Sequence, residues 1–437
     1  MQGKVQPRIL PGFMELLPED QILFNRMYDT IRSVYERFGF LPLDTPIIEL
    51  SEVLLAKAGG ETEKQIYRFQ KGDNDLSLRF DLTVPLARYV AQHSNDLVFP
   101  FKRYQMNKVF RGERPQKGRF REFYQCDIDI IGNETLDIAY DAEIPAVIYT
   151  VFSQLNFGEF TIRLNNRKVL NGFFDSLGLS ECAGDILRVI DKLEKIGPEA
   201  VAEELSVLGV DESARAKILD FVAIDGGCAD VICALQALGL GGVFAEGVAE
   251  LSTVCEYMRE FGIPEQNYKI DLTIARGLDY YTGTVYETVL NAYPGLGSIC
   301  SGGRYENLTG YYTDKKMPGI GISIGLSRLF YQLRVAGVIA PQSKCLTQAL
   351  VVPMDRDCMP YAISVSGKLR DAGIVTDIYC ADKGMKQKMK YADRLGIEYV
   401  AVIGGDEVQR GVVALKNMRT GSQETVPADD IVKRIKG

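Results

Sequence analysis

Apolar residues near the N-terminus recur at steps of three or four, the spacing of one face of an α-helix. They are Leu23, Met27, Ile31, Val34 and Phe38. The helix is expected to begin at Pro18 and to end before Gly39, a residue type favoured just past helix C-termini. Residues 40–50 contain Pro42 and Pro46 and are expected to be extended, because proline interrupts a helix.

Between residues 76 and 135 charged and apolar positions alternate, as in an antiparallel sheet with one polar face. Strands are predicted at 76–82, 101–110 and 120–131, followed by a helix at 137–155. From about residue 166 to residue 264 the apolar spacing becomes helical. Helices are predicted there at 185–195, 198–208 and 247–261. Strand patterns return at 268–274, 283–289 and 319–324, and a helix follows at 326–336.

Residues 337–343 are expected to form a linker. Beyond it, strands alternate with helices, which indicates a small α/β domain with a mostly parallel sheet. The predicted strands are 348–353, 375–379, 399–403 and 411–417, and the predicted helices are 361–371, 385–395 and 428–436.

The chain is therefore expected to be an α/β protein of three parts. An α+β core, with an antiparallel sheet flanked by helices, takes residues 1–165 and 265–336. A helical insertion takes 166–264, and a C-terminal α/β domain takes 345–437.

Composition and charge narrow the class of protein. The 437 residues are 46% hydrophobic and 25% charged, with a net charge of −8. No run of about 18 apolar residues is present and the N-terminus has no apolar leader, so we expect a cytosolic protein that does not span a membrane. From Cys345 to Gly437, 14 Lys or Arg stand against 12 Asp or Glu, a net of +2 that leaves −10 for the rest. A less acidic tail fits local contact with RNA.

Cysteine and histidine usage argues against a structural zinc site. The nine cysteines include no C-x-x-C pair, and His93 is the single histidine. Zinc sites need about four such ligands at close spacing. The thiols are expected to be reduced and mostly buried.

Residues 110–129 are the strongest candidate for chemistry. Four arginines and a lysine lie within eleven residues, and arginine suits phosphate because its planar charged fork is bidentate. Alternation puts Arg111 and Glu113 on one face of a first strand. It puts Gln125, Asp127 and Asp129 on one face of a second strand, so a cation for phosphate and carboxylates for an amine can share one surface. A solvated basic hairpin explains this segment alone about as well.

Four further segments suggest a ligand site only in combination. Asp81 and Thr83 are expected to share a strand face and suit an ammonium group. Residues 274–287 combine an arginine, two glycines and a tyrosine pair, and 300–308 contain a Gly-Gly turn. In 318–329 isoleucines alternate with glycines, which predicts one buried face and a flat groove for a planar base. Ordinary turns and strands account for each segment taken singly.

Together the five segments resemble histidyl-tRNA synthetases over nearly the whole chain. Residues 110–129 resemble the family's class II motif 2 in the histidine-specific form F-R-x-E-R-P-Q-x-G-R, and 319–328 resemble motif 3. Residues 276–281 and 301–305 resemble the signatures R-G-L-D-Y-Y and S-G-G-R-Y. The N-terminal helix and the extended segment with Pro46 resemble motif 1, which builds the dimer interface in class II synthetases. The resemblance implies a class II synthetase fold, an anticodon-binding tail, a homodimer built through motif 1, and Mg²⁺ with ATP. It implies activation of histidine by ATP and its transfer to tRNA(His).

The resemblance also implies roles for single residues. ATP would be held by Arg111, Glu113, Arg119 and Arg328. Histidine would be bound by Asp81, Thr83, Gln125, Asp129, Arg276, Tyr280 and Tyr281, with Asp129 and Tyr281 each taking one imidazole nitrogen. Arg276 and Arg111 would be catalytic. Gln116, Lys386 and Lys388 would contact tRNA.

The sequence departs from the family pattern at Met14-Glu15, where Arg-Asp is usual, and at Asp129, where glutamate is frequent. The segment at residues 79–83, which contains Asp81 and Thr83, reads R-F-D-L-T, as in archaeal and eukaryotic members. One alternative is the related regulatory subunit of ATP phosphoribosyltransferase, which tends to lose the reactive arginine and the anticodon domain. Another is a pseudo-synthetase domain that senses uncharged tRNA. Arg276 and the tail favour the ligase.

Overall fold

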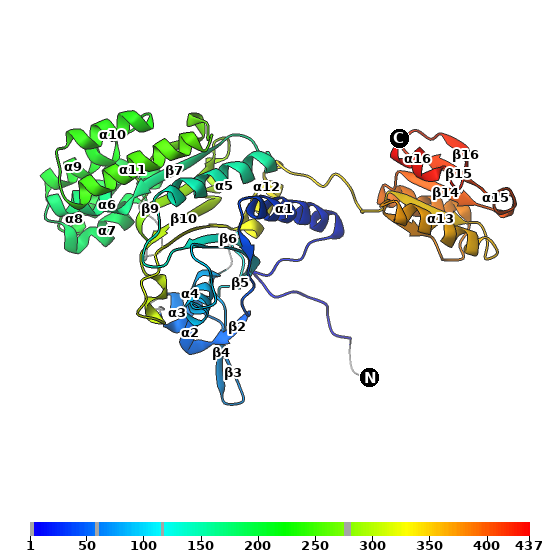
Figure 1. The fold of residues 1–437 in the computed structure, drawn as a ribbon, viewed down its shortest axis with the longest axis horizontal. Helices are drawn as coiled ribbons and strands as arrows, with labels where there is room; N and C mark the ends of the chain where they lie inside the picture. The colour runs from blue at the N-terminus through cyan, green and yellow to red at the C-terminus, as the bar shows by residue number, and fades with distance from the viewer. Residues whose placement is uncertain (1–3, 57–60, 115–117, 275–280) are drawn as a thin grey trace. The chain divides into compact units, whose positions relative to one another are not determined.

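The computed structural model describes residues 4–56, 61–114, 118–274 and 281–437 (Figure 1). The chain divides into two compact units. The first contains Met27–Ile339 and the residues up to Met14, and the second contains Ala340–Gly437 and Glu15–Arg26. None of the helices in the described ranges is long and apolar enough to cross a membrane.

An eight-stranded sheet is the centre of the first unit. Its order is β1-β5-β6-β11-β10-β9-β7-β8. The strands are β1 (Leu41–Pro42), β5 (Phe101–Phe110), β6 (Glu122–Ile131), β7 (Phe160–Asn166), β8 (Tyr268–Ile270), β9 (Tyr281–Leu290), β10 (Cys300–Tyr305) and β11 (Gly319–Ile324). The strands from β5 to β7 in this order pair antiparallel, and β1 and β8 add parallel edges. The predicted antiparallel sheet is confirmed.

A three-stranded sheet of order β2-β4-β3 lies beside it in the same unit. Its elements and the neighbouring helices are β2 (Ile48–Leu50), α2 (Ser51–Leu55), α3 (Glu61–Gln65), β3 (Arg68–Lys71), β4 (Asn74–Leu78) and α4 (Thr83–Gln92). The predicted strand 76–82 is wrong in its second half, because β4 ends at Leu78 and the chain turns into α4 at Thr83.

Helices α5 (Ala139–Leu155) and α12 (Leu326–Val335) pack against the large sheet, as does the part of α1 (Pro18–Arg37) from Met27 onward. The Tyr35 hydroxyl of α1 donates to the Cys126 carbonyl at 3.0 Å. Arg304 of β10 is held by the Asp141 carboxylate of α5, and both side chains are buried. These buried bonds fix helices to strands, since an unpaired buried charge is costly.

Six helices follow β7 in the described part of the chain: α6 (Arg167–Ser176), α7 (Ala183–Ile190), α8 (Leu193–Val207), α9 (Glu212–Val222), α10 (Cys228–Ala237) and α11 (Val243–Glu260). Helices α6 and α11 cross closely, because a Cβ at Gly172 would lie 2.5 Å from the Phe244 amide nitrogen. Phe173 and Phe221 stack with ring centroids 3.9 Å apart. Short 3₁₀ turns occur at Ser180–Cys182, Glu265–Asn267, Pro294–Leu296 and Leu308–Tyr311.

The second unit contains a five-stranded sheet of order β13-β12-β14-β15-β16. Its elements are β12 (Ala349–Pro353), α13 (Met359–Asp371), β13 (Thr376–Ile378), α14 (Met385–Leu395), β14 (Tyr399–Ile403), α15 (Gly405–Arg410), β15 (Val412–Asn417), β16 (Gln423–Pro427) and α16 (Ile431–Lys436). The first three strands in this order pair parallel and the last two add antiparallel. Apolar clusters cover both faces. The α/β tail is confirmed, but its sheet is not mostly parallel, since two of its four strand pairings are antiparallel. The sequence pattern did not predict α15 and β16.

Candidate functional site

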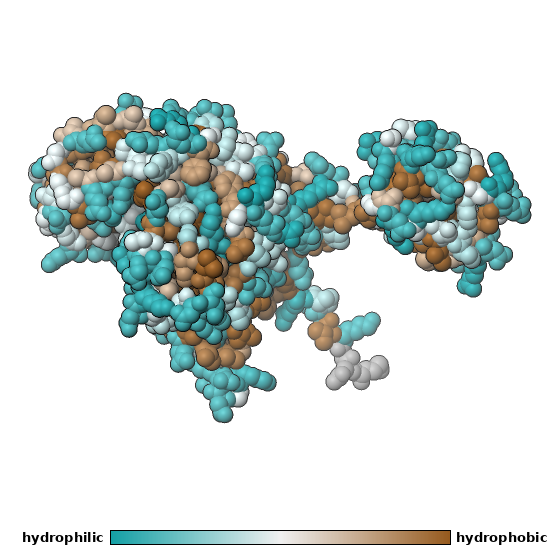
Figure 2. Space-filling model, viewed as in Figure 1, coloured by the Kyte–Doolittle hydropathy of each residue, from teal (hydrophilic) through white to brown (hydrophobic). Residues whose placement is uncertain are grey.

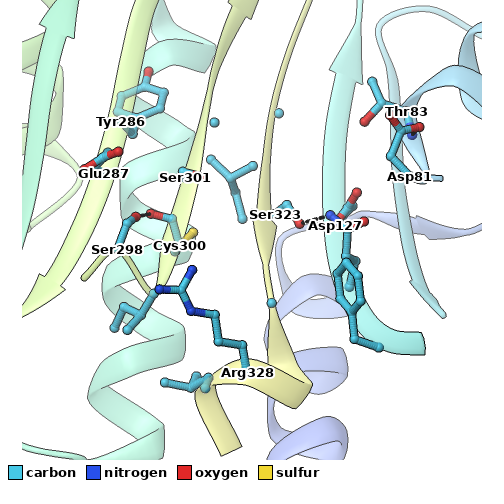
Figure 3. Close-up of a pocket in the computed structure, with 18 of the residues that line it drawn as sticks. Asp81, Thr83, Asp127, Tyr286, Glu287, Ser298, Cys300, Ser301, Ser323 and Arg328 are labelled. Carbon is cyan, nitrogen blue, oxygen red and sulfur yellow. Dashed lines mark hydrogen bonds between the residues drawn. The ribbon is translucent and has the colours of Figure 1, made fainter. Parts of the chain in front are cut away.

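A cavity of about 470 Å³ opens on one face of the large sheet (Figure 3). Strands β6, β9, β10 and β11 contribute to its wall, together with the start of α4 and with α12. The residues predicted from the sequence that line it are Asp81, Thr83, Arg111, Glu113, Arg119, Gln125, Asp129, Tyr281 and Arg328. Residues as far apart in sequence as Asp81 and Arg328 thus line the same cavity.

One face of β6 provides the acidic part of the cavity wall. Gln125, Asp127 and Asp129 alternate along the strand and all three line the cavity, so the predicted shared face is confirmed. Across the pairing with β11, Gly321 lies opposite Asp129. A Cβ at Gly321 would come within 2.2 Å of the Asp129 Oδ1 atom. Glycine is therefore needed there to leave room for the carboxylate.

Asp129 is held from two sides. Arg103, fully buried on β5, places its Nη2 atom 2.6 Å from Oδ2, and the Tyr305 hydroxyl donates to Oδ1 at 3.0 Å. Burial raises the pKa of Asp129 to about 6, against the lowering effects of Arg103 and Tyr305. The orientation of this carboxylate is thus set before any ligand arrives.

Asp127 is the least satisfied carboxylate of the β6 face. Burial raises its pKa to about 7, and Asp129 and Asp81 raise it further, while Arg103 and the Ser323 hydroxyl lower it. Within the described residues, its Oδ1 atom and the Oε1 atom of Gln125 are buried acceptors without a hydrogen-bond partner. Both side chains line the cavity, so a ligand with hydrogen-bond donors would satisfy these two acceptors.

Asp81 and Thr83 reach the cavity by a route that alternation did not predict. They do not share a strand face, because Thr83 is the first residue of α4. Instead the Asp81 Oδ1 atom accepts from the amide nitrogens of Thr83 and Val84 at 3.1 and 2.9 Å. This bond satisfies free N–H groups at the helix start and fixes the carboxylate.

Arg111 and Glu113 also differ from the prediction. Strand β5 ends at Phe110, so they lie in the loop beyond it rather than on a shared strand face. The Arg111 guanidinium carbon lies 4.4 Å from the ring centre of Phe80 and 5.1 Å from that of Phe123. Such contacts hold a cation in place while leaving its edges for a ligand.

The second arginine of the cavity comes from α12. The Arg328 Nη2 atom donates to the Leu296 carbonyl at 3.2 Å. Glu113 is 3.6 Å from Arg119 and its backbone carbonyl accepts from Arg121 at 3.1 Å. Together Arg111, Arg119 and Arg328 supply positive charge to the cavity.

Three predicted residues, Arg276, Tyr280 and Gln116, lie outside the described residues. Of the two tail lysines, Lys386 is exposed, but Lys388 is buried and donates to the Pro353 carbonyl at 2.6 Å. Its position contradicts the interpretation of Lys388 as a surface cation for phosphate.

Sequence reasoning did not select Arg103 or Ser323, and it named Tyr305 only within a signature. Arg103 pairs with Asp129 across β5 and β6, so the hairpin register would have revealed it. Ser323 pairs with Asp127 in the same way across β11. In the described ranges, no cluster of three His, Cys, Asp or Glu residues has the arrangement of a metal site.

Comparison with known proteins covers both units. A family model described as histidyl-tRNA synthetase matches residues 12–329, and one described as an anticodon binding domain matches 348–437. A histidine–tRNA ligase of Clostridium tetani is 61% identical over 99% of this chain and 98% of its own length. One from Xanthomonas campestris pv. campestris is 50% identical over 99% and 96%.

Solved structures agree with these matches. A crystal structure of histidyl-tRNA synthetase from Nostoc sp. PCC 7120 superposes with a TM-score of 0.92 at 45% identity, covering 99% of both chains. An ATP phosphoribosyltransferase regulatory subunit/histidyl-tRNA synthetase from Bacillus halodurans C gives a TM-score of 0.76 at 21% identity, over 92% of this chain and all of its own. The second likeness shows a shared fold alone.

Proposed function

Because this chain belongs to the histidyl-tRNA synthetase family and is a histidine–tRNA ligase, we propose that its cavity holds histidine and ATP side by side. There they form histidyl-adenylate, and histidine then passes to tRNA(His). The observation that carries the proposal is one cavity with carboxylates on the β6 face and arginines from the 111–119 loop and α12. The full-length match to ligases, tail included, favours this function over the regulatory subunit.

The α-ammonium group of histidine is bound by Asp81, Thr83 and Gln125 in this proposal. The Asp81 carboxylate supplies charge, and the Thr83 hydroxyl and Gln125 Oε1 supply further acceptors. The buried Oε1 atom has no hydrogen-bond partner among the described residues, which supports the assignment. A cationic donor would satisfy it and strengthen the bond through its charge.

The imidazole ring is bound between Asp129 and Tyr281, and Tyr280 completes this part of the site. Two ring nitrogens need two partners at fixed separation, and a buried nitrogen left unpaired costs about 1–3 kcal/mol. Arg103 and Tyr305 support the assignment because they hold the Asp129 carboxylate in one orientation. A fixed acceptor discriminates against side chains that lack an N–H at that point.

ATP occupies the arginine-rich part of the cavity. Arg111 and Arg328 contact phosphates, Arg119 adds charge, and Glu113 lies near the adenine. Mg²⁺ would enter on the ATP phosphates and neutralise part of their charge. Such ions take one or two protein carboxylates and otherwise water and phosphate oxygen, so the lining residue Glu287 fits this need.

In the reaction, a carboxylate oxygen of histidine attacks the α-phosphorus of ATP. The new oxygen–phosphorus bond forms as the bond to pyrophosphate breaks. Arg276, by its place in the signature, neutralises the charge that builds between carboxylate and phosphate, with Arg111 beside it. Catalysis then rests on positioning and electrostatics rather than on a covalent enzyme intermediate.

Transfer needs the tRNA to reach this cavity. We assign the acceptor end to Gln116 and the surrounding loop, and the anticodon to the tail at 345–437, where Lys386 is an exposed cation. The catalytic core comprises 1–165 and 265–336, with 166–264 as the helical insertion. The proposed setting is the cytosol.

A homodimer through residues 40–50 also belongs to the proposal. Leu41, Ile47 and Ile48 there leave 59%, 41% and 46% of their surface exposed. Hydrophobic surface is visible near β2 in Figure 2, which fits a face covered by a second copy.

Histidine-dependent exchange of pyrophosphate into ATP tests the function directly. Exchange above the level without histidine is the expected result. Binding of histidine by the purified chain with no exchange would instead identify a regulator.

A further inference from the structure

We propose that Ser323 and Asp127 position Gln125, so that its amide carbonyl and not its NH₂ group faces the ammonium group of histidine. The proposal rests on the binding role assigned to Gln125 above. It adds two positioning residues, neither of which is required to touch the substrate.

The contact that orients the amide is short. The Gln125 Nε2 atom donates to the Ser323 Oγ atom at 2.8 Å, drawn as a dashed line in Figure 3. Ser323 lies directly opposite Asp127 in the pairing of β11 with β6. Side chains of directly opposed residues stand on the same face with Cβ atoms about 5 Å apart. The hydroxyl therefore lies beside both the amide and the carboxylate.

The direction of the hydrogen bonds follows from counting protons. A serine hydroxyl has one proton to donate, and its lone pair here accepts from Gln125. The serine proton is then left for another acceptor. The carboxylate that stands directly opposite Ser323 in the strand pairing is Asp127, and an ionised carboxylate can only accept. The Ser323 hydroxyl accordingly holds the pKa of Asp127 down, against the larger effect of burial. The resulting order, Gln125 to Ser323 to Asp127, leaves Oε1 turned away from the serine.

This order matters because the two ends of an amide have nearly the same shape. If the Gln125 amide turned over, its NH₂ group would meet an ammonium group, donor against donor. Among the described residues, Ser323 is the partner to which the Gln125 Nε2 atom donates. Removing its hydroxyl therefore leaves neither orientation of the amide favoured. Asp127 in turn keeps the serine proton away from Gln125, so that Ser323 acts as the acceptor.

A purely structural role for Asp127 makes a different prediction. Arg103 is fully buried beside the β6 face, and Asp127 lowers the cost of its charge whether or not it orients Gln125. A structural role would show as lost stability of the enzyme. An orienting role would show as weaker binding of histidine, with ATP binding and turnover preserved, and would disappear once Gln125 is removed.

Ser323→Ala, Gln125→Ala and the double variant form the test, measured by pyrophosphate exchange with the full chain. We expect Ser323→Ala to raise the KM for histidine about tenfold, or about 1.4 kcal/mol, with kcat and the KM for ATP within about twofold. In the Gln125→Ala background, Ser323→Ala should add nothing. Ser323→Thr, which keeps the hydroxyl, should restore the KM. Ser366→Ala removes a buried serine of the tail as the matched control.

The outcomes separate the two proposals. If Gln125→Ala leaves the KM for histidine unchanged, the role assigned to Gln125 is wrong. If Gln125→Ala raises that KM but Ser323→Ala does not, or if the two effects multiply, Gln125 keeps its role and the positioning inference is overturned. Should Ser323→Ala not fold, Ser323→Cys offers a weaker donor and acceptor of similar size. A wild-type KM in that variant would equally overturn the inference.

Discussion

Lowering the pH should weaken histidine binding through Asp127. Its pKa stands at about 7 because burial disfavours the charged form. A bound ammonium group favours the carboxylate, so binding requires the proton to leave. The affinity contributed by this group is therefore full above about pH 8 and is lost as the pH falls through 7. For a single site with that pKa, the loss between pH 8 and pH 6 is about tenfold.

Histidine itself titrates in this range, since an imidazole pKa is about 6.5, so a matched comparison is needed. Asp127→Asn keeps an oxygen that is able to accept from Ser323 but removes the titration. Calorimetric titration with histidine, without ATP, would give dissociation constants at pH 6, 7 and 8 for both proteins. The advantage of the parent over the variant should shrink about tenfold between pH 8 and pH 6.

The same titration gives an independent check. At pH 7 the parent should release about half a proton more than Asp127→Asn on binding, which is seen from runs in buffers of different ionisation enthalpy. Parallel pH profiles with equal proton release would refute the reasoning, because the Asp127 carboxylate would then be insensitive to the ligand.

Three further substitutions test other parts of the site and the fold. Arg276→Ala should fold and bind histidine yet lose most of its activation rate, and a rate within about threefold of the parent would disprove its catalytic role. Gly321→Ala should raise the KM for histidine at least about tenfold, seen by exchange kinetics, because its Cβ would lie 2.2 Å from the Asp129 carboxylate. Arg304→Met leaves the buried Asp141 carboxylate unpaired and should cost about 3–5 kcal/mol in chemical unfolding; an unchanged midpoint would contradict that pairing as a support of the fold.

Much of the fold could be predicted because local patterns were regular. The strands at 101–110, 319–324 and 399–403 and the helix at 385–395 have the predicted bounds. The prediction failed after residue 78 because Phe80 and Leu82 continue the alternation of the strand. The turn at Asp81 is fixed by hydrogen bonds from the Thr83 and Val84 amides to its side chain, which periodicity cannot detect.

Residues of the candidate site could be predicted where they alternate along one strand. Residues brought in by pairing between strands could not. The β6 face followed from alternation alone. Arg103 and Ser323 required the register of β5 and β11 against β6, which a single chain pattern does not give. Lys388 illustrates the reverse error: its place among other lysines predicts an exposed cation, but the side chain is buried and donates to the Pro353 carbonyl.

Charge explains why histidine would enter this cavity in one direction. The β6 face has Asp127 and Asp129; the buried guanidinium of Arg103 pairs with Asp129 and lowers the pKa of both carboxyls, and Asp81 lies close enough to raise the pKa of both. The arginines that line the cavity belong to the 111–119 loop and to α12. An amino acid with both charges is oriented by such a field, its ammonium toward the acids and its carboxylate toward the arginines. The reacting oxygen would then face the phosphate by virtue of strand pairing, before any catalytic group acts.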